Sequence, residues 1–236
     1  MKIIEPSVSK KINTEKKIRY LSESLGIKYI ADKIKAGKIA ILPTSTIYGI
    51  SCVYNDIKVL EKVYEIKKRP LDMPFIILIP EIFILNYLCE DINRNAQKLI
   101  NKYWLSDNPE PLTLVFKKSS DFKKNYSQKA TPLLKNNSDK LAIRLDAMPQ
   151  IIRILKICGP VISTSATVSG TDISPKLLNE IPETIKNNVD IIFDYEKSLS
   201  GIASTIIDVT KTEPVLLREG KLKFKEIISF LNQSKF

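Results

Sequence analysis

The chain has 236 residues, 44% of them hydrophobic, which suits one large domain with a sizeable apolar core. Lysine and arginine number 37 against 26 acidic residues, so the formal charge is +11. This excess favours an anionic partner such as a nucleotide, RNA or an acidic surface, although part of it reflects a lysine-rich composition. The absence of histidine excludes a Ser-His-Asp triad and removes the commonest transition-metal ligand.

Three scattered cysteines, Cys52, Cys89 and Cys158, form no CxxC pair. This pattern indicates buried or free thiols in a reducing compartment. The N-terminus lacks the apolar core of a signal peptide, and the longest apolar runs are too short to cross a bilayer. We therefore expect a cytoplasmic protein without a membrane partner.

The first predicted elements follow a polar, basic segment, residues 1–20, which we expect to be a loose N-terminal arm. A single domain is predicted over residues 21–236. Apolar spacing and terminal signals then predict helices over 20–35 and 56–68, one or two helices over 81–103, and strands at 38–42, 74–79, 111–116 and 140–145. The lysine-rich segment 117–140 is expected to be a surface excursion.

The second half of the chain continues the alternation and then becomes rich in strands. Helices are predicted at 148–157, 175–181 and 224–231, and strands at 159–164, 189–195, 203–209 and 214–219. This order predicts an α/β protein with a partly mixed sheet.

Four loops rich in hydroxyls or cations follow predicted strands or helices. They are ILPTSTIYG (41–49), KKRP (67–70), ISTSATVSG (162–170), and the pair GIASTIIDV (201–209) and LLREG (216–220). Ligands of open α/β sheets bind beyond strand ends, where hydroxyls and cations can hold phosphate or carboxylate oxygens. Taken singly, each loop is more often a turn or a helix cap.

The combination of these loops indicates a binding cavity built from side chains. The sequence has no P-loop and no GxGxxG turn, and only seven glycines limit backbone wrapping of phosphates. Arg144 lies inside an apolar strand, and Arg218 follows another, so both charges need a polar cavity or solvent. We expect a concave, positively lined cavity.

Six segments carry a resemblance to a known family, in order over residues 24–220. They are PTSTIYGIS (43–51), IKKRPLDMPFIIL (66–78), PLTLVF (111–116), LAIRLDAMP (141–149), ISTSATVSG (162–170), and ASTIIDV with VLLREG (203–209, 215–220). The chain resembles YrdC-type threonylcarbamoyl-AMP synthases. Their corresponding patterns are P-T-x-T-x-Y-G-L, K-x-R-P-x-x-x-P-L, G-P-x-T-L, V-A-V-R-x-P, S-A-N-x-S-G and P-S-T-V-V-D…I-L-R-x-G.

The resemblance implies an α/β fold with a twisted, mostly mixed open sheet and flanking helices around a basic cavity. It also implies that L-threonine, bicarbonate and ATP give threonylcarbamoyl-AMP and pyrophosphate. The product would serve a separate transferase complex that modifies the tRNA adenosine beside the anticodon. By motif position, the ATP-binding residues would be Lys67, Arg69, Ser165 and Arg218, and the L-threonine-binding residues Thr46, Arg144, Ser163 and Ser204.

Magnesium is expected to arrive on the ATP phosphates with few protein ligands, so no metal-ligating residue is predicted. Three positions depart from the family pattern. Thr167 replaces an asparagine, Ser45 stands where an acidic residue is usual, and Leu78 stands where some members have a histidine.

Two other readings remain open at the level of sequence. One is a divergent YrdC-like paralogue that acts as an RNA-binding module, in which a basic cavity recognises double-stranded RNA or tRNA by shape and phosphates. The other is a different carbamoyl or adenylate transfer within the same family.

Overall fold

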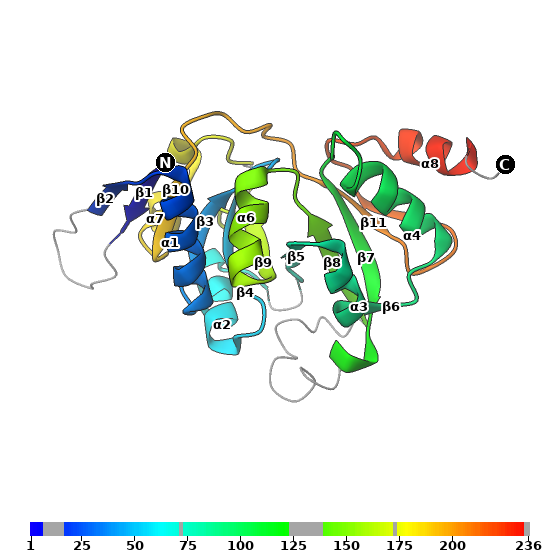
Figure 1. The fold of residues 1–236 in the computed structure, drawn as a ribbon, viewed down its shortest axis with the longest axis horizontal. Coiled ribbons are helices and arrows are strands. Elements are labelled where there is room, and N and C mark those ends of the chain that lie inside the picture. Colours follow the sequence, from blue (N-terminus) through cyan, green and yellow to red (C-terminus); the bar gives the residue numbers. More distant parts are fainter. Residues whose placement is uncertain (7–16, 71–72, 123–138, 172–173, 234–236) are drawn as a thin grey trace.

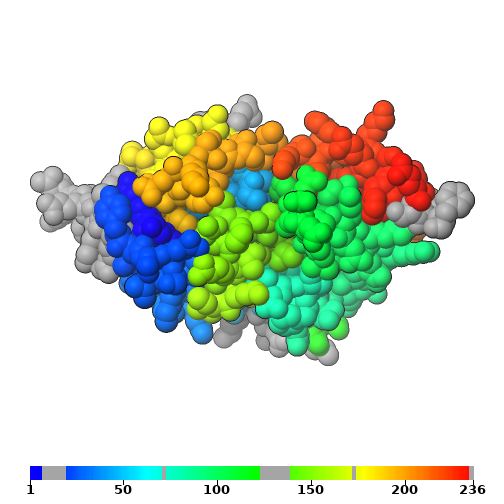
Figure 2. Space-filling model, turned by 45° about the horizontal axis from the view of Figure 1, so that its top comes forward, coloured from blue at the N-terminus to red at the C-terminus, as the bar shows by residue number. Residues whose placement is uncertain are grey.

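The computed structural model describes residues 1–6, 17–70, 73–122, 139–171 and 174–233. Figure 1 shows a single sheet running through the molecule with helices packed against it. Figure 2 shows an elongated shape, with N-terminal segments (blue) at one end and the C-terminal helix (red) at the other. Within the described ranges, no helix is long and apolar enough to cross a membrane.

Twelve strands of the described chain join this sheet. They are β1 (Lys2–Glu5), β2 (Lys17–Tyr20), β3 (Ala40–Pro43), β4 (Tyr48–Val53), β5 (Ile76–Ile79), β6 (Cys89–Glu90), β7 (Leu112–Lys118), β8 (Lys140–Leu145), β9 (Val161–Ser165), β10 (Ile191–Asp194), β11 (Thr205–Asp208) and β12 (Val215–Arg218). Their spatial order is β12-β11-β7-β8-β5-β9-β4-β3-β10-β1-β2, and β6 pairs with β7. The pairs β3–β10, β5–β8 and β7–β11 are parallel and the others antiparallel, so the predicted mixed sheet is confirmed.

The longer helices are α1 (Glu23–Lys35), α2 (Ile57–Lys67), α6 (Pro149–Cys158) and α8 (Phe224–Gln233). The shorter ones are α3 (Leu85–Leu88), α4 (Arg94–Leu99), α7 (Glu183–Lys186), the 3-10 turns η1 (Ile82–Ile84) and η3 (Leu178–Glu180), and the π-helical η2 (Ile100–Trp104). Helices α1 and α6 lie side by side over the sheet (Figure 1).

Helix α2 shows how local sequence fixes an element that borders the site. Its N-cap is Asp56, whose carboxylate accepts hydrogen bonds from the N–H groups of Lys58 and Val59. Its C-cap is Lys68, which has a left-handed backbone conformation with φ of 49°. This turn lets Lys67 point into the interior while Arg69 leaves the helix toward the cavity.

The N-terminal segment differs from the loose arm predicted for residues 1–20. Strand β1 pairs with β10 on one side and with β2 on the other. The side chain of Ile3 is fully buried. The expectation is therefore wrong for both strands, because short segments suffice once an open sheet edge is available. Residues 7–16 of the predicted arm lie outside the described residues.

Other differences are smaller. Strand β4 was not predicted: its first two residues were included in the hydroxyl-rich loop 41–49, and glycine and serine interrupt its apolar sequence YGISCV. The helix predicted over 175–181 is only the turn η3. Most of the lysine-rich excursion, residues 123–138, lies outside the described residues. All three cysteines are free, as the sequence predicted.

Candidate active site

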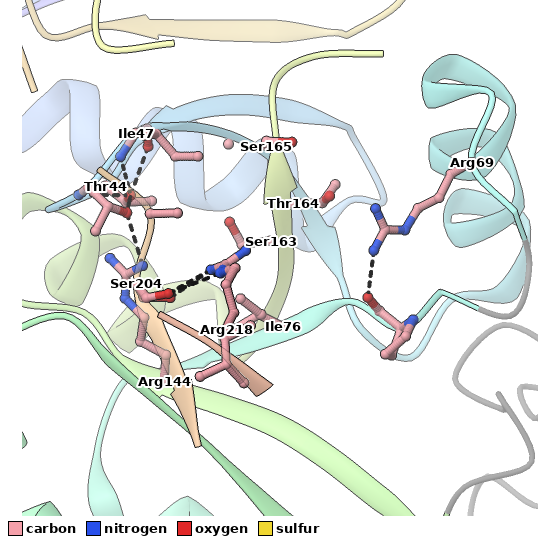
Figure 3. A pocket seen from close by; sticks show the side chains of 15 residues that line it. Thr44, Ile47, Arg69, Ile76, Arg144, Ser163, Thr164, Ser165, Ser204 and Arg218 are labelled. Atoms are coloured by element: carbon pink, nitrogen blue, oxygen red, sulfur yellow. Dashed lines mark hydrogen bonds between the residues drawn. The ribbon is translucent and has the colours of Figure 1, made fainter. Parts of the chain in front are cut away.

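A cavity of about 160 Å³ lies where the turn after β3 meets β9, the residues after α2 and the β11–β12 pair (Figure 3). The polar side chains in its lining are Thr44, Thr46, Arg69, Arg144, Ser163, Thr164, Ser165, Ser204 and Arg218. These residues come from segments up to 174 positions apart (218 − 44), so the folded sheet alone brings them together. The expected positively lined cavity is present.

Arg144 is built into the floor of this cavity at the end of β8, and only 4% of it is exposed. Its Nη1 donates a hydrogen bond to Thr46 Oγ1 at 3.0 Å, and its Nη2 donates to Ser45 Oγ at 2.8 Å. Its Nε is buried and has no partner among the described residues. An unpaired buried donor costs about 1–3 kcal/mol.

Asp146 contacts the site and was not among the residues that the sequence predicted. It forms an ion pair with Arg144 Nη2, and its side chain has no exposed surface. Its Oδ1 accepts hydrogen bonds from the N–H groups of Ser45 (3.0 Å) and Met148 (2.9 Å). Residues two apart leave a strand on the same face, so the spacing of Arg144 and Asp146 was the available signal.

Arg218, the last residue of β12, lies beside Arg144 and donates hydrogen bonds to Ser204. Its Nε and Nη2 donate to the Ser204 carbonyl oxygen at 3.1 and 2.9 Å, and Nη2 also donates to Ser204 Oγ at 3.2 Å. Partial desolvation, and to a lesser degree the charge of Arg144, lowers the pKa of Arg218. Two neighbouring guanidinium groups make this part of the cavity suited to an anion.

Arg69 lies across the cavity from Arg144 in Figure 3. Its Nη2 donates to the Pro74 carbonyl oxygen at 2.9 Å, and its guanidinium lies 5.4 Å from the centroid of the Phe75 ring. The residue is half-buried, and these contacts hold its charge at the cavity wall.

Lys67 lies behind the cavity lining rather than in it. It has no exposed surface, and its Nζ donates to the carbonyl oxygens of Ser165 (2.5 Å) and Thr167 (2.6 Å). Burial, with a smaller contribution from the nearby Arg69 charge, lowers the pKa of Lys67 to about 7. The ammonium group therefore holds the loop that presents Ser165.

Thr167, the position that departs from the family's asparagine, is buried in the same loop. Its hydroxyl lies 3.1 Å from Ser165 Oγ, and its N–H donates to the Ser165 carbonyl oxygen at 2.8 Å. Its side chain thus contacts Ser165 from behind.

Gly49 allows β4 and β9 to approach closely beneath the cavity. A Cβ atom at this position would lie 2.7 Å from Ser163 Oγ and 3.2 Å from the Thr164 carbonyl oxygen. Such contacts are closer than van der Waals packing permits, so a larger residue would push apart the two strands that carry the lining.

The structure thus brings seven of the eight predicted binding residues into one cavity. They are Thr46, Arg69, Arg144, Ser163, Ser165, Ser204 and Arg218, with Lys67 directly behind. Their assignment to ATP or threonine stays a prediction.

The chemistry of the lining does not match a protein-built metal site. Within the described residues, no group of three or more His, Cys, Asp or Glu side chains is arranged to hold a metal ion. The carboxylate of Asp146 is engaged with the cavity residue Arg144. A magnesium ion here would take its ligands from a nucleotide and water.

The chain belongs to the Sua5/YciO/YrdC family. The model of this family, described as "Telomere recombination", matches residues 32–220. The matched range includes every cavity residue named above.

Particular relatives refine this placement. The chain is 31% identical to the threonylcarbamoyl-AMP synthase of Pyrococcus abyssi, over 89% of this chain and 58% of that protein. It is 30% identical to a putative threonylcarbamoyl-AMP synthase of Methanocaldococcus jannaschii, over 85% of this chain and 88% of that protein. It therefore spans little more than half the length of the first relative.

Solved structures agree with the fold. P. abyssi Sua5 complexed with L-threonine superposes with a TM-score of 0.78 at 30% identity, over 90% of this chain and 58% of that one. Escherichia coli YciO superposes with a TM-score of 0.71 at 20% identity, over 88% and 95% of the two chains, which supports the fold alone.

Proposed function

We propose that this chain is an L-threonylcarbamoyladenylate synthase, a nucleotidyltransferase that converts L-threonine, bicarbonate and ATP into threonylcarbamoyl-AMP and pyrophosphate. The main support is one cavity that combines three arginines with hydroxyls from three segments. This cavity occurs in a chain 30% identical to a protein solved with L-threonine.

The proposed reaction has two bond-forming steps. The neutral amine nitrogen of threonine attacks carbon dioxide derived from bicarbonate, loses a proton and becomes a carbamate. A carbamate oxygen then attacks the α-phosphorus of ATP, the bond from that phosphorus to the α–β bridging oxygen breaks, and pyrophosphate leaves with the electron pair. Both steps depend on positioning and on neutralising oxyanions, which arginines and hydroxyls supply without histidine.

The threonine end of the cavity is proposed to be the floor around Arg144. Thr46 and Arg144 are 1% and 4% exposed, so they can meet only a ligand that enters the cavity. Ser163 and Ser204 carry hydroxyls in the same lining. Arg144 would direct hydrogen bonds at the threonine carboxylate, and the hydroxyls would hold its remaining polar atoms.

The ATP end is proposed to lie between Arg69, Arg218 and Ser165. Charge-assisted hydrogen bonds from guanidinium groups to phosphate are worth about 1.5–3 kcal/mol each. Lys67, whose ammonium binds the Ser165 and Thr167 carbonyls, would support the phosphate site through the loop. Magnesium would accompany the ATP phosphates.

We also propose that the product is passed to a separate transferase complex acting on tRNA. The threonylcarbamoyl-adenylate is a mixed anhydride, so a nucleophilic acceptor is needed to use it. The net charge of +11 is compatible with an encounter with tRNA.

Pyrophosphate release from ATP tests the proposal. We expect release to require both L-threonine and bicarbonate, and a product with the mass of threonylcarbamoyl-AMP to accumulate. L-Valine, which has the shape of threonine without its hydroxyl, serves as the control substrate. Pyrophosphate release at the same rate without threonine, or a product of another mass, would contradict the proposal. Either result would indicate a different carbamoyl or adenylate transfer.

A paired substitution tests the assignment of the phosphate site. Arg218→Gln should raise the KM for ATP about tenfold, the loss of one charge-assisted hydrogen bond. Arg153→Gln is the matched control, because Arg153 is paired with Glu23 on the surface. Equal effects of the two substitutions on the KM for ATP would contradict the assignment of Arg218 to the phosphate site.

The RNA-binding module is a weaker candidate. Contact with A-form RNA needs side chains that reach a broad phosphate surface. Arg144 and Thr46 lie buried on a cavity floor instead. RNA binding with a steep salt dependence and no turnover of threonine would nevertheless favour it over the synthase.

A further inference from the structure

We infer that Asp146 is a positioning residue for Arg144: its carboxylate fixes the guanidinium of Arg144 in the orientation that the threonine site needs. The inference rests on the proposed function and adds to it a residue that does not line the cavity. Its evidence is a buried hydrogen-bond network between the end of β8, the turn after β3 and the start of α6.

Asp146 divides its two carboxylate oxygens between two tasks. Oδ2 accepts a hydrogen bond from Arg144 Nη2. Oδ1 accepts from the N–H groups of Ser45 and Met148, at 3.0 and 2.9 Å. One buried carboxylate thus orients the arginine and also joins the turn after β3 to the residues that precede α6.

The orientation of Arg144 follows from this arrangement. Because Nη2 is held by Asp146 and by Ser45 Oγ, Nη1 is directed to Thr46 Oγ1 at 3.0 Å. Nη1 has a second N–H besides the one it donates to Thr46 Oγ1, whereas the unpartnered Nε is buried. Loss of the ion pair would free the planar group to rotate, and its hydrogen bonds would no longer be arranged in advance for a ligand.

The charges around the cavity also support a positioning role for Asp146. Arg144 and Arg218 lie close enough for their charges to affect each other. Two neighbouring guanidinium groups repel in a poorly solvated site unless a carboxylate compensates one of them. Asp146 compensates Arg144, so Arg144 supplies directed hydrogen bonds while Arg218 keeps its charge for the anionic ligand.

Ser45 gives the inference a sharp test. Its Oγ lies 2.8 Å from Arg144 Nη2 and 3.4 Å from Asp146 Oδ2. A carboxylate placed at position 45 would therefore reach the same guanidinium nitrogen. With Asp146 present, however, it would put two carboxylates against each other in a buried site, which is unfavourable.

The first variant is Asp146→Asn, which keeps an acceptor for the N–H groups of Ser45 and Met148 but turns an NH₂ donor toward Arg144. We expect the KM for L-threonine to rise about tenfold, as for the loss of one hydrogen bond to a charged group, while the KM for ATP stays within about threefold. Asp208→Asn is the matched control, because Asp208 pairs with Lys140 outside the cavity lining.

In the second set of variants, the effect of Ser45→Asp on the KM for threonine should depend on the residue at position 146. Ser45→Asp alone should raise the KM for threonine, whereas Ser45→Asp combined with Asp146→Asn should restore it to within about threefold of the wild type. Ser45→Asn in the Asp146→Asn background lacks the carboxylate and should not rescue. A merely structural role of Asp146 would not produce this charge-specific rescue.

The outcomes separate this inference from the proposed function. If the wild type makes threonylcarbamoyl-AMP but Asp146→Asn leaves the KM for threonine unchanged, or Ser45→Asp fails to rescue, the positioning role is wrong. If the wild type does not turn over threonine, the proposed function fails. The crystal structure of Asp146→Asn then decides the inference, which requires Arg144 Nη1 to leave Thr46 Oγ1.

Discussion

Lys67 is a lysine without exposed surface, and its ammonium contacts two backbone carbonyls instead of a carboxylate. The sequence context KKRP suggested three similar cations at a helix end. In the fold they differ: Lys67 is buried, Lys68 is exposed in a left-handed turn, and Arg69 lines the cavity. Adjacent residues of one type can therefore have unrelated roles, because a helix end points successive side chains in different directions.

The burial of Lys67 predicts a pH dependence of stability. Its pKa is lowered from 10.5 to about 7 in the folded protein. As pH rises above 7, the folded protein loses this proton while the unfolded chain keeps it. The contribution of Lys67 to stability should therefore rise with pH, by up to about 1.4 kcal/mol per pH unit, and level off near the unfolded pKa.

Denaturant unfolding of the wild type and Lys67→Met at pH 6, 8 and 9 measures this effect, since the variant lacks the titrating group. The difference in the free energy of unfolding should shift in favour of the wild type as pH rises. Lys68→Met controls for removing a charge from the same segment. A difference that does not change between pH 6 and 9 would show that the carbonyls keep Lys67 protonated.

At the scale of elements, the cavity depends on how strand ends are held against one another. Gly220 packs after β12 so closely that a Cβ atom would lie 2.1 Å from the Ala203 carbonyl oxygen and 2.6 Å from the Ser204 carbonyl carbon. The N–H of Gly220 donates to Thr205 Oγ1 at 3.0 Å. These contacts set the position of Arg218 relative to Ser204, so the β11–β12 pair acts as one wall of the site.

Gly220→Ala should therefore displace this wall. We expect a loss of about 1–3 kcal/mol in the free energy of unfolding, typical of overpacking, together with weaker ATP binding. Calorimetry with ATP and thermal unfolding would measure the two effects. Gly159→Ala is the control: Gly159 has a φ of 85° but nothing within 4 Å of its added Cβ, so it should lose stability while ATP binding is kept. Unchanged ATP affinity in Gly220→Ala would refute the role of this wall.

At the scale of the whole molecule, the sheet extends well beyond the cavity. Strands β1 and β2 continue it past β10 at the end opposite β12. They are far from the site in the strand order, and they lie before residue 32, where the family match begins. They extend the fold by covering an edge that would otherwise expose unpaired backbone groups.

Ile3→Ala tests whether this N-terminal part belongs to the stable fold. Ile3 is fully buried, so its truncation should lower the free energy of unfolding by about 2–5 kcal/mol. Leu25→Ala on α1, where 61% of the side chain is exposed, should change it by no more than about 0.5 kcal/mol. Equal, small effects in equilibrium unfolding would mean that β1 contributes little to stability.

Much of the fold was predictable because the spacing of apolar residues along the sequence indicates the helices and strands. Apolar spacing located α1, α2, α6 and α8, and apolar runs located most of the strands. Strand β4 was missed because YGISCV has no clear alternation, and its place between β3 and β9 depends on Gly49. Motif order also identified the segments that line the cavity, since hydroxyls and arginines concentrate at strand ends.

By itself, then, the sequence determined the α/β class, the order of the main elements and the segments that carry the site. Only the tertiary structure decided that Asp146 binds the turn at Ser45, that Lys67 lies behind the cavity and that the first strands join the sheet. The physical reason is that hydrophobic periodicity acts between residues a few positions apart. Partners of buried charges, such as Lys67 and Ser165, are brought together over about a hundred residues only when the sheet is packed.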